Sequence, residues 1–170
     1  MAELDILEYP DPRLRLRAVP VTVFDDDLAR LIDDLLETLR ARTAIGLSAT
    51  QVDDQRQVLV IDNSGNALAP QVYVNPEICS RRAFGFVEES CLSVPGVVGN
   101  VIRATEVQVR AQDRHGEAFE RALSGMDAVC LQHEMDHLAG KLFIDRLSIF
   151  RRLRIRARAR AKARHLAATG

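Results

Sequence analysis

The chain has 170 residues, of which 47% are hydrophobic and 28% are charged, as in water-soluble globular proteins. A chain of this length is expected to form one domain and to bury roughly 70% of the surface that its unfolded form exposes. It contains no run of about 18 uncharged apolar residues, which excludes a transmembrane helix, and its acidic first residues are not those of a signal peptide.

The net charge of −1 combines an acidic body with a cationic tail. Residues 146–170 hold nine lysines and arginines and no acidic side chain, whereas the densest acidic stretch is "DDD" at 25–27. The three cysteines, Cys79, Cys91 and Cys130, cannot all pair with one another. Together with the lack of an export signal, this predicts a cytoplasmic protein whose thiols are free for metal binding or for the core.

Residues 24–43, "FDDDLARLIDDLLETLRART", are predicted to form an amphipathic helix. Their leucines and isoleucine recur at helical spacing, and their aspartates lie at the N-terminal end, where the helix dipole favours negative charge. The preceding segment, 9–15, is not expected to begin a helix, because each of its two prolines pushes the residue before it into an extended conformation.

The middle of the chain favours strands. Two β-rich runs, 57–62 and 71–75, are separated by the loop-like "NSGNALAP" at 63–70. Residues 105–123 are typical of a hairpin that turns at 113–116. Strands accompanied by a few long helices, without one-for-one alternation, indicate an α+β fold.

Residues 124–140, "SGMDAVCLQHEMDHLAG", are predicted to form a second helix. Ser124 and Asp127 resemble a capping box at its start, and Gly140 is expected to end it. The arginine- and alanine-rich tail is predicted to form a third helix.

The second helix carries the pattern H-E-x-x-H at 133–137. Positions i and i+4 share one face of a helix, so His133 and His137 can bind one ion. Glu134 is rotated by about 100° from His133, which suits a base that acts on a water at the metal. The same pattern also arises by chance on ordinary helices, so a solvated face with an incidental histidine pair is the alternative.

A third protein ligand would favour the metal site. Asp136, His115 and the three cysteines are candidates by chemistry. Asp136 lies on the neighbouring helix face, His115 is expected in a turn, and Cys130 is expected to face the core. Spacing alone does not choose between Cys91 and Cys79.

Three segments, "IGLSATQ" at 45–51, "EESCLSVPG" at 88–96 and "QHEMDHLAGKLFIDRLS" at 132–148, resemble the motifs of peptide deformylases in order and spacing. The opening "ILEYPDPRLR" is also similar, so the likeness covers nearly the whole chain. The resemblance implies one catalytic domain over 1–148 and a basic helical extension over 149–170. It also implies antiparallel sheets wrapped around the helix that bears H-E-x-x-H.

The resemblance assigns Cys91, His133 and His137 as the ligands of one divalent ion per chain. A thiolate and two imidazoles leave the fourth position to water, as in a catalytic site. The family's usual ion is Fe²⁺, which Zn²⁺ or Ni²⁺ can replace, and this ligand set suits several divalent metals.

The implied reaction is hydrolysis of the formyl group from the N-terminal formyl-methionine of nascent polypeptides, with release of formate. Glu134 is expected to take a proton from the water on the metal and to deliver it to the leaving amine. By resemblance, the Gln51 side-chain amide and the Leu92 backbone N–H stabilise the oxyanion. Standing alone, Gln51 would be interpreted as a polar loop residue, and Ser93 and Pro95 are expected to shape the turn after the ligand.

A methionine side chain needs an apolar slot. By family position, seven residues are expected to contribute to substrate binding, although any apolar one of them can instead belong to the core: Ile45, Gly46, Val87, Glu89, Met126, Val129 and Cys130.

The sequence departs from the family pattern at Ala44 and Ser90, where glycine is usual, and at Ser48, where alanine is usual. A positive φ at Ala44 or Ser90 would cost about 1–2 kcal/mol. The atoms needed for the chemistry remain, which favours an active enzyme with altered rate or preference over a catalytically weak relative.

The basic tail is typical either of a solvated helix or of a surface that contacts phosphates. The family's C-terminal helix docks on the ribosome near the peptide exit, and this tail suits that partner. Aromatic residues for base stacking are nearly absent, so no sequence-specific nucleic acid recognition is expected. The alternative functions are a zinc endopeptidase and a weakly catalytic, ribosome-binding module.

Overall fold

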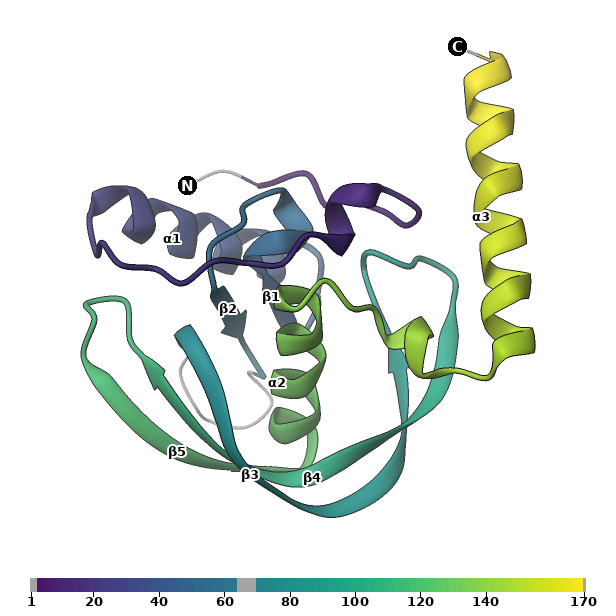
Figure 1. Ribbon diagram of the computed structural model, residues 1–170. Helices are drawn as coiled ribbons and strands as arrows, with labels where there is room; N and C mark the ends of the chain where they lie inside the picture. Colours follow the sequence, from purple (N-terminus) through teal and green to yellow (C-terminus); the bar gives the residue numbers. More distant parts are fainter. Residues whose placement is uncertain (1–2, 64–69, 170) are drawn as a thin grey trace.

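The computed structural model describes residues 3–63 and 70–169, with side chains as far as residue 161. Helices and strands do not alternate along the chain (Figure 1), which confirms the α+β class. The helices are α1 (Asp26–Ala41), α2 (Gly125–Leu138) and α3 (Ile149–Thr169). The strands are β1 (Gly46–Ser48), β2 (Val58–Ile61), β3 (Gln71–Ser90), β4 (Val98–Gln112) and β5 (Ala118–Ser124). Short 3-10 turns lie at Pro12–Arg15, Ala49–Val52 and Phe143–Arg146.

The five described strands form one antiparallel sheet in the order β1-β2-β3-β4-β5, where several sheets had been expected. The long β3 and β4 bend around α2, which stands in the hollow of the sheet (Figure 1). Register shifts between Val74 and Glu77 and between Ile78 and Ser80 interrupt their pairing, and such irregularities increase local bending. The helix is thereby enclosed by the strands that precede it.

The helix and hairpin predictions are confirmed. Asp25 caps α1, because its carboxylate accepts hydrogen bonds from the N–H groups of Asp27 and Leu28. The hairpin turns between β4 and β5 as expected. The continuation of β3 to Ser90 was not predicted, because residues 79–84 are exposed on both faces and carry no alternating pattern.

The predicted capping box of α2 is wrong. Ser124 occupies the N-cap position, but its side chain makes no capping hydrogen bond. The histidine-bearing face of α2 is buried in the sheet, so the interpretation as a solvated helix face is also wrong. The helix ends before Gly140, which adopts a φ of +71° as expected of a C-terminal glycine.

Three apolar clusters hold these elements together. One packs α1 on β1 and β2, a second packs α2 on the sheet, and a third joins the N-terminal segment to the loop after β3 and the turn at Phe143–Arg146. Helix α2 therefore stands between the sheet and the N-terminal layer, and its polar side chains lie at the centre of the molecule.

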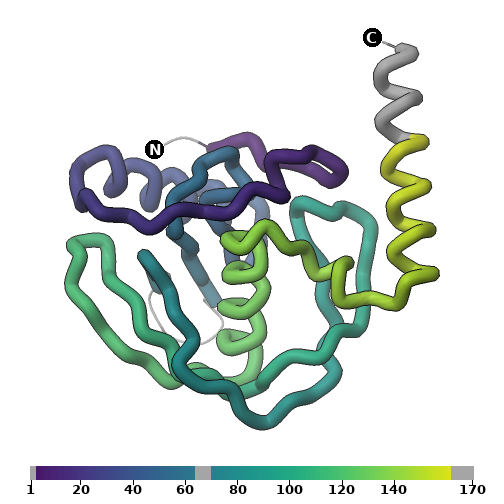
Figure 2. The backbone as a smooth tube through the Cα atoms, in the orientation of Figure 1, coloured from purple at the N-terminus to yellow at the C-terminus, as the bar shows by residue number. Residues whose placement is uncertain are grey.

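Helix α3 projects from the body along most of its length (Figures 1 and 2). Among its described side chains, only Ile155 is buried. Its first turn is attached by hydrogen bonds from Arg151 to the carbonyl of Val98 and from Arg152 to the carbonyl of Asp145. No helix in the described parts of the chain is long and apolar enough to cross a membrane.

Gly140→Ala is expected to lower the free energy of unfolding by about 2–4 kcal/mol. A Cβ at this position would lie 2.4 Å from the carbonyl oxygen of Arg15 and would also be strained by the positive φ. Gly125→Ala is the matched control, because Gly125 has a φ of +58° and no neighbour within 4 Å of the added Cβ. Urea unfolding should give a loss of only about 1 kcal/mol for the control. Equal losses would contradict the role of the backbone contact.

Candidate metal centre

The three predicted ligands meet beside α2. Cys91 directly follows β3, and His133 and His137 project from one face of α2. The Nε2 atom of His137 lies 3.2 Å from the Cys91 Sγ and 3.3 Å from the His133 Nε2, and the three ligand atoms all lie within 4.8 Å of one another. One soft sulfur and two imidazole nitrogens at these separations fit a single divalent transition-metal ion.

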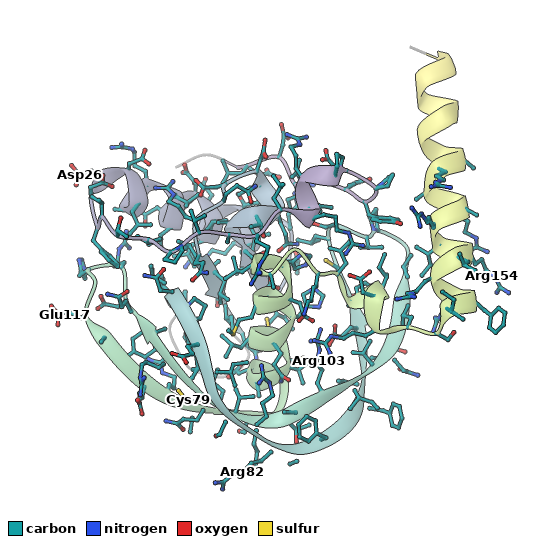
Figure 3. The ribbon with its side chains drawn as sticks, in the orientation of Figure 1. Asp26, Cys79, Arg82, Arg103, Glu117 and Arg154 are labelled. Atoms are coloured by element: carbon teal, nitrogen blue, oxygen red, sulfur yellow. The ribbon has the colours of Figure 1, made fainter. Side chains whose placement is uncertain are left out.

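The remaining candidate ligands lie elsewhere. His115 occupies the exposed turn between β4 and β5, and Cys79 is exposed on the outer side of β3 (Figure 3). Cys130 is buried beside the cluster, and burial raises the pKa of its thiol well above the ordinary value. The sulfur that lies within 4.8 Å of both imidazole nitrogens is that of Cys91, so Cys91 is the cysteine that suits the ion.

A buried chain of charges orients His133. Its Nδ1 lies 2.9 Å from Glu89 Oε2, so the Nε2 is left to face the other ligands. Arg103 donates to the same carboxylate through Nε at 2.6 Å and Nη2 at 3.0 Å. Its Nη1 contacts Asp136 at 2.6 Å, and Asp136 also accepts hydrogen bonds from Arg146. Glu89 was predicted to bind substrate, and in the structure it contacts the ligand His133. Asp136 was a candidate third ligand, and in the structure it binds Arg103 and Arg146.

Arg103 had not been recognised from the sequence. Its side chain is 1% exposed and lies between the sheet and α2 (Figure 3). No local motif surrounds it, because its partners come from β3 and α2. Burial by itself would raise the pKa of Glu89, but hydrogen bonds with His133 and Arg103 outweigh burial and lower that pKa. The carboxylate therefore stays charged inside the protein.

The two imidazoles differ in their affinity for a proton. Burial acts to lower the pKa of His133, but hydrogen bonds with Cys91 and Glu89 outweigh it and raise that pKa well above the ordinary value. Burial, reinforced by the nearby His133, holds the pKa of His137 well below its ordinary value. His137 is thus a neutral nitrogen donor, and a cation that binds here must displace the proton from His133.

Glu134 lies on the wall of the adjoining cavity. Burial raises the pKa of its carboxyl to about 7, against the opposing effects of His133 and a hydrogen bond with Ser48. Its Oε2 is buried and has no hydrogen-bond partner among the described residues. Gly46 leaves room for it, because a Cβ there would lie 2.7 Å from Glu134 Oε1 and 2.4 Å from Cys130 Sγ. An acceptor of this kind can take a proton near neutral pH.

Gln51 is buried beside Cys91, so it is not an exposed loop residue. Its Oε1 accepts hydrogen bonds from the Ser48 backbone N–H at 3.0 Å and from the Ser48 hydroxyl at 2.9 Å. Its Nε2 lies 3.1 Å from Ser93 Oγ and 3.7 Å from Cys91 Sγ. Ser93, expected only to shape the turn, therefore also contacts the amide.

These groups border a cavity of about 510 Å³. Most of the predicted substrate and catalytic residues line it: Ile45, Gly46, Gln51, Glu89, Leu92, Met126, Val129, Cys130 and Glu134. The ligands Cys91 and His133 line it as well. Val87 does not; it packs against the cluster that contains Val94 and Val101.

The departures from the family pattern cause no backbone strain. Neither Ala44 nor Ser90 has a positive φ, although the neighbouring Thr43 does, at 51°. Both Ala44 and Ser90 line the cavity, so their side chains border whatever binds there. Ser48 places an additional hydroxyl group between Gln51 and Glu134.

Comparison with known proteins agrees with this geometry. The polypeptide deformylase family profile matches residues 3–152. A peptide deformylase of Tolumonas auensis is 48% identical over 165 residues, which are 97% of this chain and 99% of that protein. The crystal structure of a peptide deformylase from Legionella pneumophila is similar with a TM-score of 0.90 and 44% identity, over 99% of each chain. One from Ehrlichia chaffeensis in complex with actinonin has a TM-score of 0.88 and 32% identity, over 95% of this chain and 98% of that one.

Glu89→Gln is expected to weaken metal affinity by about 10–100-fold, because the neutral amide orients His133 less strongly and removes one of the two charged partners of Arg103. Competition between the protein and a zinc chelator measures this loss. Glu88→Gln is the matched control, since Glu88 is the adjacent, exposed residue and should leave the affinity unchanged. Equal affinities for Glu89→Gln and the native chain would refute the positioning role.

Proposed function

Because this chain belongs to the polypeptide deformylase family, we propose that it is a metal-dependent hydrolase that removes the formyl group from N-terminal formyl-methionine of nascent polypeptides. The observation that carries the proposal is the meeting of three metal-ligating side chains with Glu134 and Gln51 at one cavity. Each of these groups has a distinct part in the hydrolysis of an amide bond.

The proposed ligands of one divalent ion per chain are Cys91, His133 and His137. When bound, such an ion supplies Lewis-acid chemistry, which acidifies water and polarises a carbonyl group. We propose Fe²⁺ as the ion in the cell, with Zn²⁺ or Ni²⁺ able to replace it.

Glu134 is the proposed general base. It accepts the proton that a water molecule loses as its oxygen attacks the formyl carbon. The Gln51 amide and the Leu92 backbone N–H donate hydrogen bonds to the oxygen that becomes negative. Glu134 then passes the proton to the amine as the C–N bond breaks, which releases formate and leaves a free N-terminal methionine. A buried carboxyl with a raised pKa suits both transfers, because it binds and releases protons readily.

The proposed methionine slot is the apolar part of the cavity, formed by Ile45, Gly46, Met126, Val129 and Cys130. Val87 lies outside this slot and packs against the same apolar cluster as Cys91. Glu89 was also predicted to bind substrate, but we propose that its carboxylate orients the metal ligand His133 instead.

The proposed domain arrangement is one catalytic domain over 1–148 with an extension over 149–170, and the proposed location is the cytoplasm.

The proposed partner of the extension is ribosomal RNA near the peptide exit. Helix α3 projects from the body (Figure 1) and carries six exposed arginines: Arg151, Arg152, Arg154, Arg156, Arg158 and Arg160. In Figure 3, Arg154 points away from the domain.

Formate release from a formyl-Met-Ala peptide tests the activity. The native chain should release formate and should not cleave casein, which separates a deformylase from a zinc endopeptidase.

Glu134→Ala should keep its metal, measured by elemental analysis, yet lose turnover. Gln51→Ala should lower kcat by about 10²–10³-fold. A metal-loaded Glu134→Ala protein with full turnover would refute the base assignment. A native chain that holds metal without releasing formate would favour a non-catalytic ribosome-binding module.

Removal of residues 149–170 is expected to leave formate release intact and to weaken ribosome binding, measured by co-sedimentation. Binding by the full chain should fall more than about tenfold between 50 and 200 mM salt, because arginine–phosphate contacts release counterions. Replacing Arg154 and Arg158 with lysine should preserve binding, whereas replacing them with glutamine should reduce it. Ribosome binding that is insensitive to both salt and truncation would contradict the proposal that α3 binds ribosomal RNA.

A further inference from the structure

The Gln51 amide can serve as an oxyanion donor in only one of its two orientations. Rotation of an amide by 180° exchanges its NH₂ group and its carbonyl oxygen. With Nε2 beside Cys91, Gln51 offers a donor to the cavity; reversed, it would present an oxygen and repel developing negative charge. Some feature of the protein must therefore hold the productive orientation.

Ser48 supplies two donors to the opposite side of the amide. Its backbone N–H lies 3.0 Å from Gln51 Oε1 and its hydroxyl lies 2.9 Å from the same atom. In the reversed orientation, the NH₂ group would face the Ser48 N–H, which cannot accept a hydrogen bond. The two contacts to Oε1 thus stabilise one orientation and disfavour the other.

Burial strengthens this effect. Ser48 is fully buried and Gln51 is 2% exposed, so water does not compete for the amide oxygen. Hydrogen bonds in such surroundings polarise one another, and donors on the carbonyl make the amide N–H a stronger donor. The Ser48 hydroxyl is therefore placed both to orient Gln51 and to strengthen its Nε2 as a donor.

We propose that Ser48 is a positioning residue for the deformylation reaction: its hydroxyl holds Gln51 Oε1 so that Nε2 faces the oxyanion. The inference rests on the proposed function. Ser48 does not touch the reacting atoms, and it acts through Gln51. The hydroxyl also lies near Glu134, so the test must separate an effect on Gln51 from an effect on the base.

A double-mutant cycle on the metal-loaded protein makes this separation. Ser48→Ala removes only the hydroxyl, and we expect kcat for formyl-Met-Ala peptide to fall about 3–10-fold while KM stays within about twofold. In the Gln51→Ala background, Ser48→Ala should cause no further loss. Thr38→Val is the control, because it removes another buried hydroxyl, which contacts Leu4 and Asp34 and neither Ser48 nor the Gln51 amide, and it should leave kcat unchanged.

A second measurement does not depend on turnover. In the zinc form labelled with ¹⁵N-glutamine, the Gln51 side-chain NH₂ should exchange with water several times faster in Ser48→Ala than in the native chain. An unchanged kcat, a loss that persists in the Gln51→Ala background, or an unchanged exchange rate would each overturn the inference. If the native chain released no formate, the proposed function would fail, and the exchange rate alone would decide whether Ser48 orients Gln51.

Discussion

The metal centre depends on the hydrogen bonds that the buried carboxylate of Glu89 makes. It belongs to β3, yet it pairs with Arg103 of β4 and orients His133 of α2. A guanidinium buried this deeply requires charged partners, and Glu89 and Asp136 supply them from two different elements. The sheet and the catalytic helix are therefore joined by the same charges that direct an imidazole toward the metal position.

The length and bend of β3 and β4 make this arrangement attainable. A shorter β3 would not carry Glu89 and Cys91 back to α2, because the strand must pass around the helix before it reaches the far side (Figure 1). In the pairing of β3 with β4, Arg103 lies opposite Gly85, and its long side chain reaches the carboxylate of Glu89 four residues further along β3. The ligand Cys91, the carboxylate that orients His133 and the arginine that keeps this carboxylate charged thus come from one hairpin.

The two catalytic groups that we propose are held by opposite physical effects. Glu134 is deprived of solvent, so its carboxyl has a high affinity for a proton. Gln51 Oε1 accepts two hydrogen bonds from Ser48 and Nε2 donates one to Ser93, so one orientation of the amide is favoured. Both effects depend on the exclusion of water from these two side chains. Strand β1 contributes to this exclusion, because Gly46 allows Glu134 to approach closely and Ser48 forms a hydrogen bond with Gln51.

The sequence by itself determined the elements whose signals are local. Aspartates followed by leucines at helical spacing define α1, and His133 and His137 share a face of α2 because they are four residues apart. Motif resemblance then predicted the roles of Cys91, Glu134 and Gln51, since three short segments in fixed order are far more specific than one. Spacing without resemblance left the third ligand open.

Only the tertiary structure decided how these segments support one another. Arg103 carries no local signal, because its partners lie 14 and 33 residues away in the chain and become neighbours only when the sheet bends around α2. Glu89 was expected at the substrate, yet burial beside His133 gives its charge a different partner. Burial and long-range pairing are properties of the folded chain, so no pattern of neighbouring residues encodes them.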